Sequence, residues 1–182
     1  MQIYTIGHSN HPIDEFLHLL HERGVSLVAD VRSTPYSRFH PQFNRNSLQE
    51  ALSGQGIEYV YLGDSLGGRP KDPTCYLHHA IPEHSKDYLH EVNYAEVMKR
   101  PWFIQGIRQL LELAGMKPTA TLCSEEDPAR CHRHHLIARY ILSVHPEVRI
   151  YHIRKDAQIL DARDLVTPAD GSASDQLSFL KP

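Results

Sequence analysis

The sequence lacks long apolar runs, and this absence excludes one class of protein. No stretch approaches the roughly 20 apolar residues that a membrane-spanning helix requires, so no membrane partner is expected. The first residues also lack the basic-then-apolar order of a secretion signal. We therefore expect a cytoplasmic protein.

Basic residues and cysteines are also scarce. There are 19 Lys and Arg against 22 Asp and Glu, a formal net charge of −3. Extended nucleic-acid binding is therefore not favoured, although a local basic groove would be compatible with a single strand. Cys75, Cys123 and Cys131 are too few and too odd in number for a disulfide framework. In a reducing compartment they would be free thiols or metal ligands.

The residues that are present predict one α/β domain. At 182 residues and 41% hydrophobic, the chain can bury a continuous core. Strands are expected at 2–6, 25–31, 57–62, 119–123 and 147–153, and helices at 13–24, 46–55, 93–100, 101–115 and 128–145. This alternation predicts a single-domain, mostly parallel β-sheet flanked by helices on both faces.

Two regions fall outside this alternation. Residues 63–92, rich in Gly, Pro and His, should form a long loop with short helical turns. The domain is expected to cover 1–155, followed by a partly loose C-terminal extension over 156–182.

The four segments that carry most of the reactive side chains, 7–10, 30–44, 62–69 and 123–133, each follow an expected strand. Ligands of parallel sheets bind beyond the carboxyl ends of the strands. These segments should therefore converge on one ligand pocket at that edge. The sequence predicts neither a cofactor nor an oligomeric state.

Segments 30–44 and 62–69 hold candidate binding groups. Arginine offers a planar fork that suits phosphate or carboxylate, and interleaved aromatic rings suit stacking. In the glycine-rich segment, Gly67 and Gly68 would allow the backbone to approach a ligand closely, although the spacing matches no nucleotide-binding loop. The alternative is structural: Arg32 pairs with an acid and the rings fill the core.

The segment 122–141 contains the densest chemistry. Asp127 and Pro128 are typical of a helix start. The apolar stripe of the expected helix extends back to His132 and Arg133, which should point inward, while Arg130 and His134 should face solvent. An inward Arg133 requires a partner, namely Asp30, Glu125 or an anionic ligand.

Cys123 ends a strand before this helix, an order similar to the phosphate loops of cysteine phosphatases and rhodaneses. The spacing differs, because Ala129 stands where those loops carry arginine. Cys123, Cys131 and His135 are candidate metal ligands, but the seven residues between the cysteines exceed the usual zinc spacing, so no metal is the preferred interpretation. A disulfide switch between Cys123 and Cys131 is a further alternative.

Five segments carry a family resemblance: "TIGHS" (5–9), "DVRSTPYSRF" (30–39), "YLGDSLGGR" (61–69), "YAEVM" (94–98) and "LCSEEDPARCHR" (122–133). With them the chain resembles the family numbered 488 among domains of unknown function. The resemblance implies an α/β domain with these motifs grouped in one pocket, and it implies no reaction. The positions carried over are His8, Asp30, Arg32, Arg38, Arg69, Cys123, Glu125, Cys131, His132 and Arg133.

We expect a small enzyme, a hydrolase or transferase, that acts on an anionic ligand such as a nucleotide or a nucleic-acid-derived substrate. The catalytic candidates are His8, Asp30, Cys123, Glu125 and His132, with the carboxylates as general base and the histidines as acid/base partners. The substrate-binding candidates are Arg32, Tyr36, Arg38, Phe39, Arg69 and Arg133. Two alternatives stay open: a non-catalytic module that binds a nucleotide or single-stranded nucleic acid, and a thiol- or metal-dependent protein that uses Cys123 and Cys131.

Overall fold

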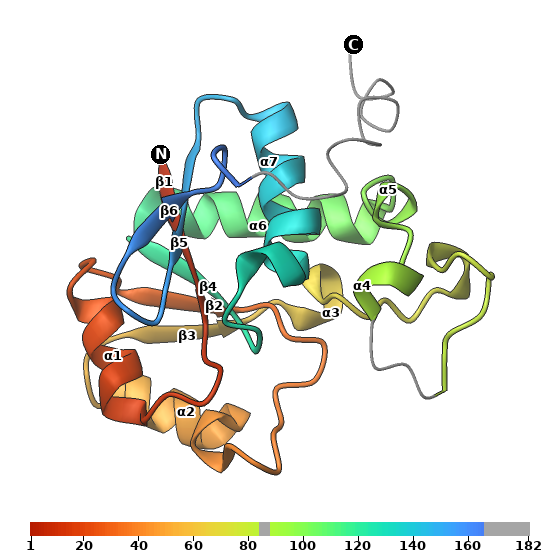
Figure 1. The fold of residues 1–182 in the computed structure, drawn as a ribbon. Helices are drawn as coiled ribbons and strands as arrows, with labels where there is room; N and C mark the ends of the chain where they lie inside the picture. The colour runs from red at the N-terminus through yellow and green to blue at the C-terminus, as the bar shows by residue number, and fades with distance from the viewer. Residues whose placement is uncertain (84–87, 166–182) are drawn as a thin grey trace.

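The computed structural model, which describes residues 1–83 and 88–165, has one six-stranded sheet (Figure 1). Its order is β3-β2-β4-β1-β5-β6, and every pair is parallel except β5 with β6. The strands are β1 (Gln2–Gly7), β2 (Leu27–Asp30), β3 (Glu58–Tyr61), β4 (Thr119–Cys123), β5 (Arg149–Ile153) and β6 (Ile159–Asp161). The predicted mostly parallel α/β fold is confirmed.

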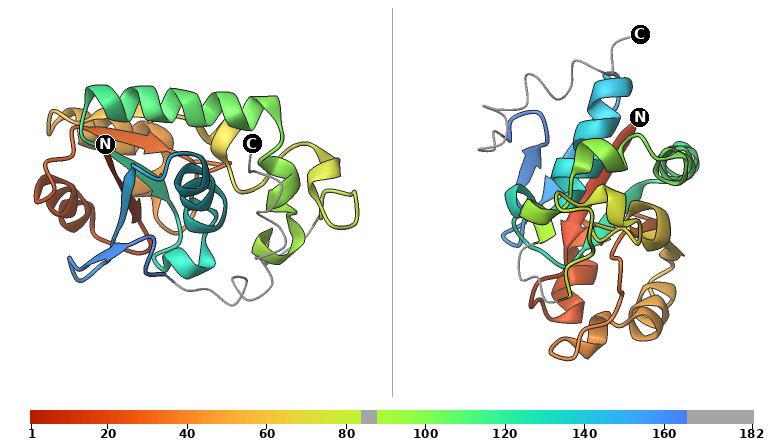
Figure 2. Two further views of the ribbon diagram at one scale, coloured as in Figure 1. Left: turned by 90° about the horizontal axis from the view of Figure 1, so that it is seen from above. Right: turned by 90° about the vertical axis from the view of Figure 1, so that its right-hand side faces the viewer.

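Helices cover both faces of the sheet (Figure 2). The α-helices are α1 (Ile13–His21), α2 (Arg45–Ser53), α3 (Gly63–Leu66), α4 (Tyr88–Glu91), α5 (Tyr94–Val97), α6 (Pro101–Met116) and α7 (Arg139–Val144). The 3-10 turns are η1 (Pro41–Phe43), η2 (Pro73–Cys75) and η3 (Pro128–Arg130), and η4 (Arg133–Ala138) is π-helical. Apolar residues of α1 and α2 form one core with the sheet, and those of α6 and α7 form the other.

The sequence explains the principal elements. In α1, Phe16, Leu17 and Leu20 share the buried face, and Gly24 ends the turn after it with φ +63°, a conformation that glycine adopts without strain. Every residue of β2 is buried, as expected of a strand covered on both faces. Pro101 occupies the first position of α6, where its missing N–H leaves no hydrogen bond unmade.

The expected single helix over 128–145 is wrong in detail, because the chain divides into η3, η4 and α7. Asp127 caps η3 through a hydrogen bond from the Ala129 N–H to its carboxylate (3.0 Å). Cys131 then adopts an extended backbone, φ −137° and ψ 140°, which interrupts the helix. The Asp-Pro pair therefore starts only one turn, and the longer helical segment begins after His132.

Two further segments lie outside the regular alternation of strands and helices. Residues 63–92 contain the short helices α3, η2 and α4, as expected, apart from residues 84–87, which lie outside the described part. Within the expected extension over 156–182, β6 pairs with β5 at the sheet edge, and residues 166–182 lie outside the described part. No helix among the described residues is long and apolar enough to cross a membrane.

Candidate functional site

The carboxyl ends of three adjacent strands, β1, β4 and β2, bring the candidate segments together. His8 N–H donates to the Cys123 carbonyl (2.9 Å), and Ser9 N–H donates to the Ser124 carbonyl (2.9 Å). On the other side of β4, Val31 N–H donates to the Leu122 carbonyl (3.0 Å). The segments after these strands therefore run side by side, with the one from β4 in the middle.

Cys123, Cys131 and His132 form a buried group that we call the thiol–imidazole cluster. His132 Nε2 lies 3.1 Å from the carbonyl oxygen of Val31. Because a carbonyl can only accept, Nε2 carries a hydrogen, and Nδ1 is left to face the sulfur atoms. Nδ1 lies 3.6 Å from Cys123 Sγ and 3.9 Å from Cys131 Sγ. The same imidazole nitrogen therefore lies near both sulfur atoms.

The two cysteines of the cluster have opposite acidities. A hydrogen bond from Cys131 lowers the pKa of the Cys123 thiol well below its usual value, and the charges of His132 and Arg133 act in the same direction. Burial raises the pKa of Cys131, and the neighbouring Cys123 raises it further. Cys123 is therefore the thiolate of the pair, and Cys131 keeps its proton.

His8 lies beside the cluster with one ring nitrogen unused. Its Nδ1 donates to the Ser9 carbonyl (2.9 Å), and its ring stacks on Phe43 with the centroids 4.4 Å apart. Nε2 is buried and has no hydrogen-bond partner among the described residues. Burial and the nearby Arg32 lower the pKa of His8 to about 4, so the ring is neutral at pH 7 and Nε2 is an available acceptor.

Asp30 and Arg32 bind each other in a buried ion pair. Arg32 Nε donates to Asp30 Oδ1 (2.9 Å) and Nη2 donates to Oδ2 (2.6 Å). Arg32 Nη1 also donates to the Phe43 carbonyl (2.9 Å), and the Tyr59 hydroxyl donates to Asp30 Oδ2 (2.8 Å). These contacts use both side chains within the protein and favour the structural interpretation of Arg32.

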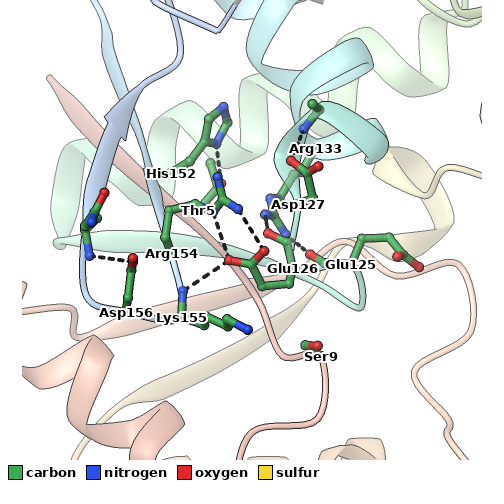
Figure 3. Close-up of polar contacts among 12 residues, drawn as sticks. Thr5, Ser9, Glu125, Glu126, Asp127, Arg133, His152, Arg154, Lys155 and Asp156 are labelled. Atoms are coloured by element: carbon green, nitrogen blue, oxygen red, sulfur yellow. Dashed lines mark hydrogen bonds and ion pairs between the residues drawn. The ribbon is translucent and has the colours of Figure 1, made fainter.

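Arg133 is fully buried, as its place on the apolar stripe predicts. Its Nη1 and Nη2 donate to the main-chain carbonyls of Glu125 and Glu126 (Figure 3). Of the expected partners, Glu125 does bind Arg133, although through its main-chain carbonyl, since its side chain is exposed. The expected pairing with Asp30 is wrong, because Asp30 pairs with Arg32. The Arg133 side chain therefore fixes the loop that follows Cys123 by binding main-chain carbonyls of that loop.

The same loop is held from the opposite side by Arg154, just after β5. Arg154 Nε and Nη2 donate to the two carboxylate oxygens of Glu126 (2.8 and 2.9 Å), and Lys155 N–H donates to Glu126 Oε1 (3.2 Å) (Figure 3). The hydrogen bonds from Arg154 lower the pKa of Glu126 to about 2. Two arginines on different elements thus fix the backbone directly after Cys123.

Two glycines allow the close packing around the cluster. A Cβ at Gly7 would lie 1.7 Å from the Glu125 carbonyl oxygen. A Cβ at Gly68 would lie 2.7 Å from the His132 ring. We expected Gly68 to let the backbone approach a ligand closely. In the structure the His132 ring occupies the space beside its Cα.

The prediction that His134 faces solvent is wrong. Its side chain is 2% exposed, and Nδ1 lies 3.0 Å from His152 Nε2, while His152 Nδ1 lies 2.7 Å from Thr5 Oγ1. The prediction assumed α-helical periodicity, and the wider π-helical winding of η4 turns His134 toward β5. Burial, with Arg133 nearby, lowers the pKa of His152 to about 2. His152 is not among the predicted site residues, although it shares the buried face of β5 with Ile150 at a period of two.

The other predicted binding residues lie on the surface. Tyr36 and Phe39 are 68% and 77% exposed, and the Arg38 guanidinium lies 4.9 Å from the Phe39 ring centroid. The Arg69 guanidinium lies 4.2 Å from the Tyr88 ring centroid, and the main-chain N–H of Arg69 donates to Ser33 Oγ (2.9 Å). These side chains are available to a ligand but do not join the thiol–imidazole cluster.

The cluster also contains the donor atoms that a soft metal ion prefers. Both sulfur atoms and one nitrogen of His132 lie within 4.8 Å of one another, and sulfur and imidazole nitrogen are typical zinc ligands. The predicted candidate His135 lies outside this group, with Nε2 2.7 Å from the Ala129 carbonyl.

A hollow of about 390 Å³ lies at the opposite edge of the sheet, beside the amino ends of β1 and β4. It is lined by Gln2, Tyr4, Arg23, Ala114, Gly115, Met116, Lys117 and Pro118. None of the predicted site residues lines it.

One comparison with known proteins found a match. The family described as "Domain of unknown function DUF488" matches residues 12–141. The matched range holds Asp30, Arg133 and the whole thiol–imidazole cluster, and it begins after His8. Neither the curated proteins nor the solved structures gave a match.

Proposed function

The chain belongs to the family described as domain of unknown function DUF488, and we propose that it is a small thiol-dependent enzyme, a hydrolase or a transferase, that acts on an anionic substrate. The observation that carries the proposal is the pairing of Cys123 Sγ with His132 Nδ1 at 3.6 Å. A nucleophile held beside a base, which is itself oriented by a third group, is typical of covalent catalysis. Here the third group is the Val31 carbonyl.

The reaction would begin at Cys123. Its thiolate attacks an electrophilic carbon or phosphorus atom of the substrate, forming a covalent bond to Sγ while the bond to the leaving group breaks. His132 Nδ1, when protonated, is placed to give its proton to the leaving group. The same nitrogen then accepts a proton from a water or an acceptor alcohol, whose oxygen attacks the covalent intermediate. The bond to Sγ breaks, the product leaves, and the Cys123 thiolate is restored. Cys131 stabilises the thiolate through its S–H hydrogen bond.

Groups around the cluster support a polar substrate. His8 Nε2 is a buried acceptor without a partner among the described residues, which suits an O–H or N–H of the substrate. Arg69 follows Gly68, whose Cα packs against the His132 ring, and its exposed guanidinium, which lies over the Tyr88 ring, suits an anionic group of a substrate that extends from the cluster to the surface. The exposed rings of Tyr36 and Phe39 support a nucleotide or nucleic-acid-derived substrate, because such rings can stack on a base.

Turnover of a panel of thioesters, carboxylate esters, phosphomonoesters and nucleotides tests the proposal. Wild type, Cys123→Ser and Cys75→Ser are compared, since Cys75 is a buried free thiol outside the cluster. We expect loss of turnover by at least about 100-fold in Cys123→Ser and little change in Cys75→Ser. A covalent adduct on Cys123 in the intact mass would identify the intermediate.

Equal turnover by wild type and Cys123→Ser would contradict the proposal. Thermal stabilisation of both proteins by a nucleotide, without turnover by either, would instead support the non-catalytic binding module.

A further inference from the structure

We propose that Cys123 and Cys131 form a reversible disulfide when the protein meets a hydroperoxide, so that the thiol–imidazole cluster is a site of oxidative modification. Both sulfur atoms face the same nitrogen, His132 Nδ1, at 3.6 and 3.9 Å. They lie within 4.8 Å of each other, and a disulfide requires about 2.05 Å. Rotation of the two side chains toward each other has only a short gap to close.

The backbone around the pair supports a local closure. Cys123 is the last residue of β4, and Cys131 is the extended residue between η3 and η4. The intervening loop is already folded back and fixed at Glu126 by Arg154 and at the Glu125 carbonyl by Arg133. The disulfide would therefore close a loop whose ends the fold already holds together, at little cost in chain entropy.

The two cysteines divide the roles that such an oxidation requires. Cys123 is the thiolate, and it is also the more accessible of the two, 6% exposed against 2% for Cys131. Cys131 is protonated and lies against it, which suits a resolving cysteine.

The oxidation consumes one molecule of hydrogen peroxide and releases two molecules of water. The Cys123 thiolate attacks one peroxide oxygen and the O–O bond breaks, which converts Cys123 to a sulfenic acid. The second oxygen leaves as hydroxide and takes the proton of His132 Nδ1 to become water, so that Nδ1 is left as an acceptor. The Cys131 sulfur, giving its proton to His132 Nδ1, then attacks the Cys123 sulfur. The S–O bond breaks, and the hydroxide leaves with that proton as a second water. Two thiols are oxidised and one peroxide is reduced, and a dithiol reverses the change.

Oxidation would remove the nucleophile of the proposed enzyme, and reduction of the disulfide would restore it. The inference shares Cys123 with the proposed function but does not depend on its reaction, because it concerns only the two sulfur atoms. Cys75 serves as an internal reference. It is buried, and burial raises the pKa of its thiol, so it should resist the same treatment.

Peptide mass spectrometry after treatment with hydrogen peroxide tests the inference. Trypsin cuts after Arg108, Arg130 and Arg133, so a disulfide joins peptide 109–130 to peptide 131–133. We expect this joined pair in wild type and in Cys75→Ser, with loss of two hydrogen atoms from the intact mass, and we expect dithiothreitol to reverse both. In Cys131→Ser, dimedone should label Cys123 as the trapped sulfenic acid.

Three results would overturn the inference: separate peptides after oxidation of wild type, a joined pair that involves Cys75, or no dimedone label in a folded Cys131→Ser variant. Circular dichroism establishes that this variant is folded, and wild type alone suffices for the first two. If wild type forms the disulfide but Cys123→Ser keeps full turnover, this inference stands and the proposed function is contradicted. Turnover that depends on Cys123 without a disulfide would do the reverse.

Discussion

The Arg32 guanidinium donates two hydrogen bonds to the carboxylate of Asp30, and both side chains are buried at the carboxyl end of β2. The pair also binds the Phe43 carbonyl and the Tyr59 hydroxyl, so it ties the loop after β2 to η1 and β3. Two side chains that the sequence nominates separately for substrate binding and catalysis thus neutralise each other beside the thiol–imidazole cluster.

Arg32→Ala should destabilise the protein by about 3–5 kcal/mol, because it leaves the Asp30 carboxylate buried without its counter-charge. Lys71→Ala is the control, since Lys71 pairs with Asp64 in an exposed bridge at 3.2 Å and its loss should have no measurable effect. Urea denaturation followed by circular dichroism measures both. Equal unfolding midpoints for the two variants would show that the buried pair is not structural.

Acid should destabilise the fold in the range between pH 6.5 and pH 4.5. Folding lowers the pKa of His8 to about 4 and of His152 to about 2, both below the usual 6.5. Below pH 6.5 the unfolded chain therefore binds protons that the folded chain refuses, and stability falls as pH falls. Each histidine lowers the free energy of unfolding by up to about 1.4 kcal/mol for each pH unit by which the pH falls in this range. Glu126 adds its own loss only below its usual pKa of 4.5.

His8→Phe keeps the ring stacked on Phe43 and removes one of these titrations, so the loss of stability between pH 6 and pH 5 should be roughly half as steep. His18→Gln is the control, because His18 is an exposed residue of α1. Denaturation at a series of pH values measures both slopes. A slope in His8→Phe as steep as in wild type would contradict the assignment of His8 as a buried neutral group.

Gly7→Ala should destabilise the protein by about 1–3 kcal/mol or more, because the added Cβ meets the Glu125 carbonyl oxygen. Gly115→Ala provides the matched control within α6, where the nearest atom to an added Cβ is 3.6 Å away. That substitution should stabilise by about 0.4–1 kcal/mol, since alanine has less freedom in the unfolded chain. Thermal melting distinguishes the two, and melting temperatures that shift in the same direction would refute the close packing at Gly7.

Cys123 should react with iodoacetamide before Cys75 and Cys131 at pH 6 to 7. Because the pKa of Cys123 is lowered and the pKa values of the other two thiols are raised, Cys123 has the largest thiolate fraction of the three. Peptide mapping at successive times gives the order of labelling. His132→Ala should slow the labelling of Cys123 relative to wild type, since it removes a charge and a hydrogen bond from the sulfur. Labelling of Cys75 first would contradict the assignment.

The sequence predicts the sheet well, because strands buried on both faces are short apolar runs bounded by turns, as at 119–123. It also predicts that Arg133 points inward, since the apolar stripe of its helix is unambiguous. It does not predict that Arg133 binds carbonyl oxygens, because a main-chain acceptor has no signature in the sequence. His134 is misplaced for a different reason: the expected periodicity is α-helical, whereas η4 is wound more widely.

The π-helical winding of η4 also restricts how the chain can vary in length. One residue fewer between Arg133 and Ala138 would allow an ordinary α-helix with i to i+4 hydrogen bonds. With α7 held in the core by Ile141, that deletion would rotate everything before it by about 100°. The His132 ring would then lose its contacts with both the Val31 carbonyl and Cys123. A chain with one residue fewer in this stretch would therefore hold Cys123 without an imidazole beside it.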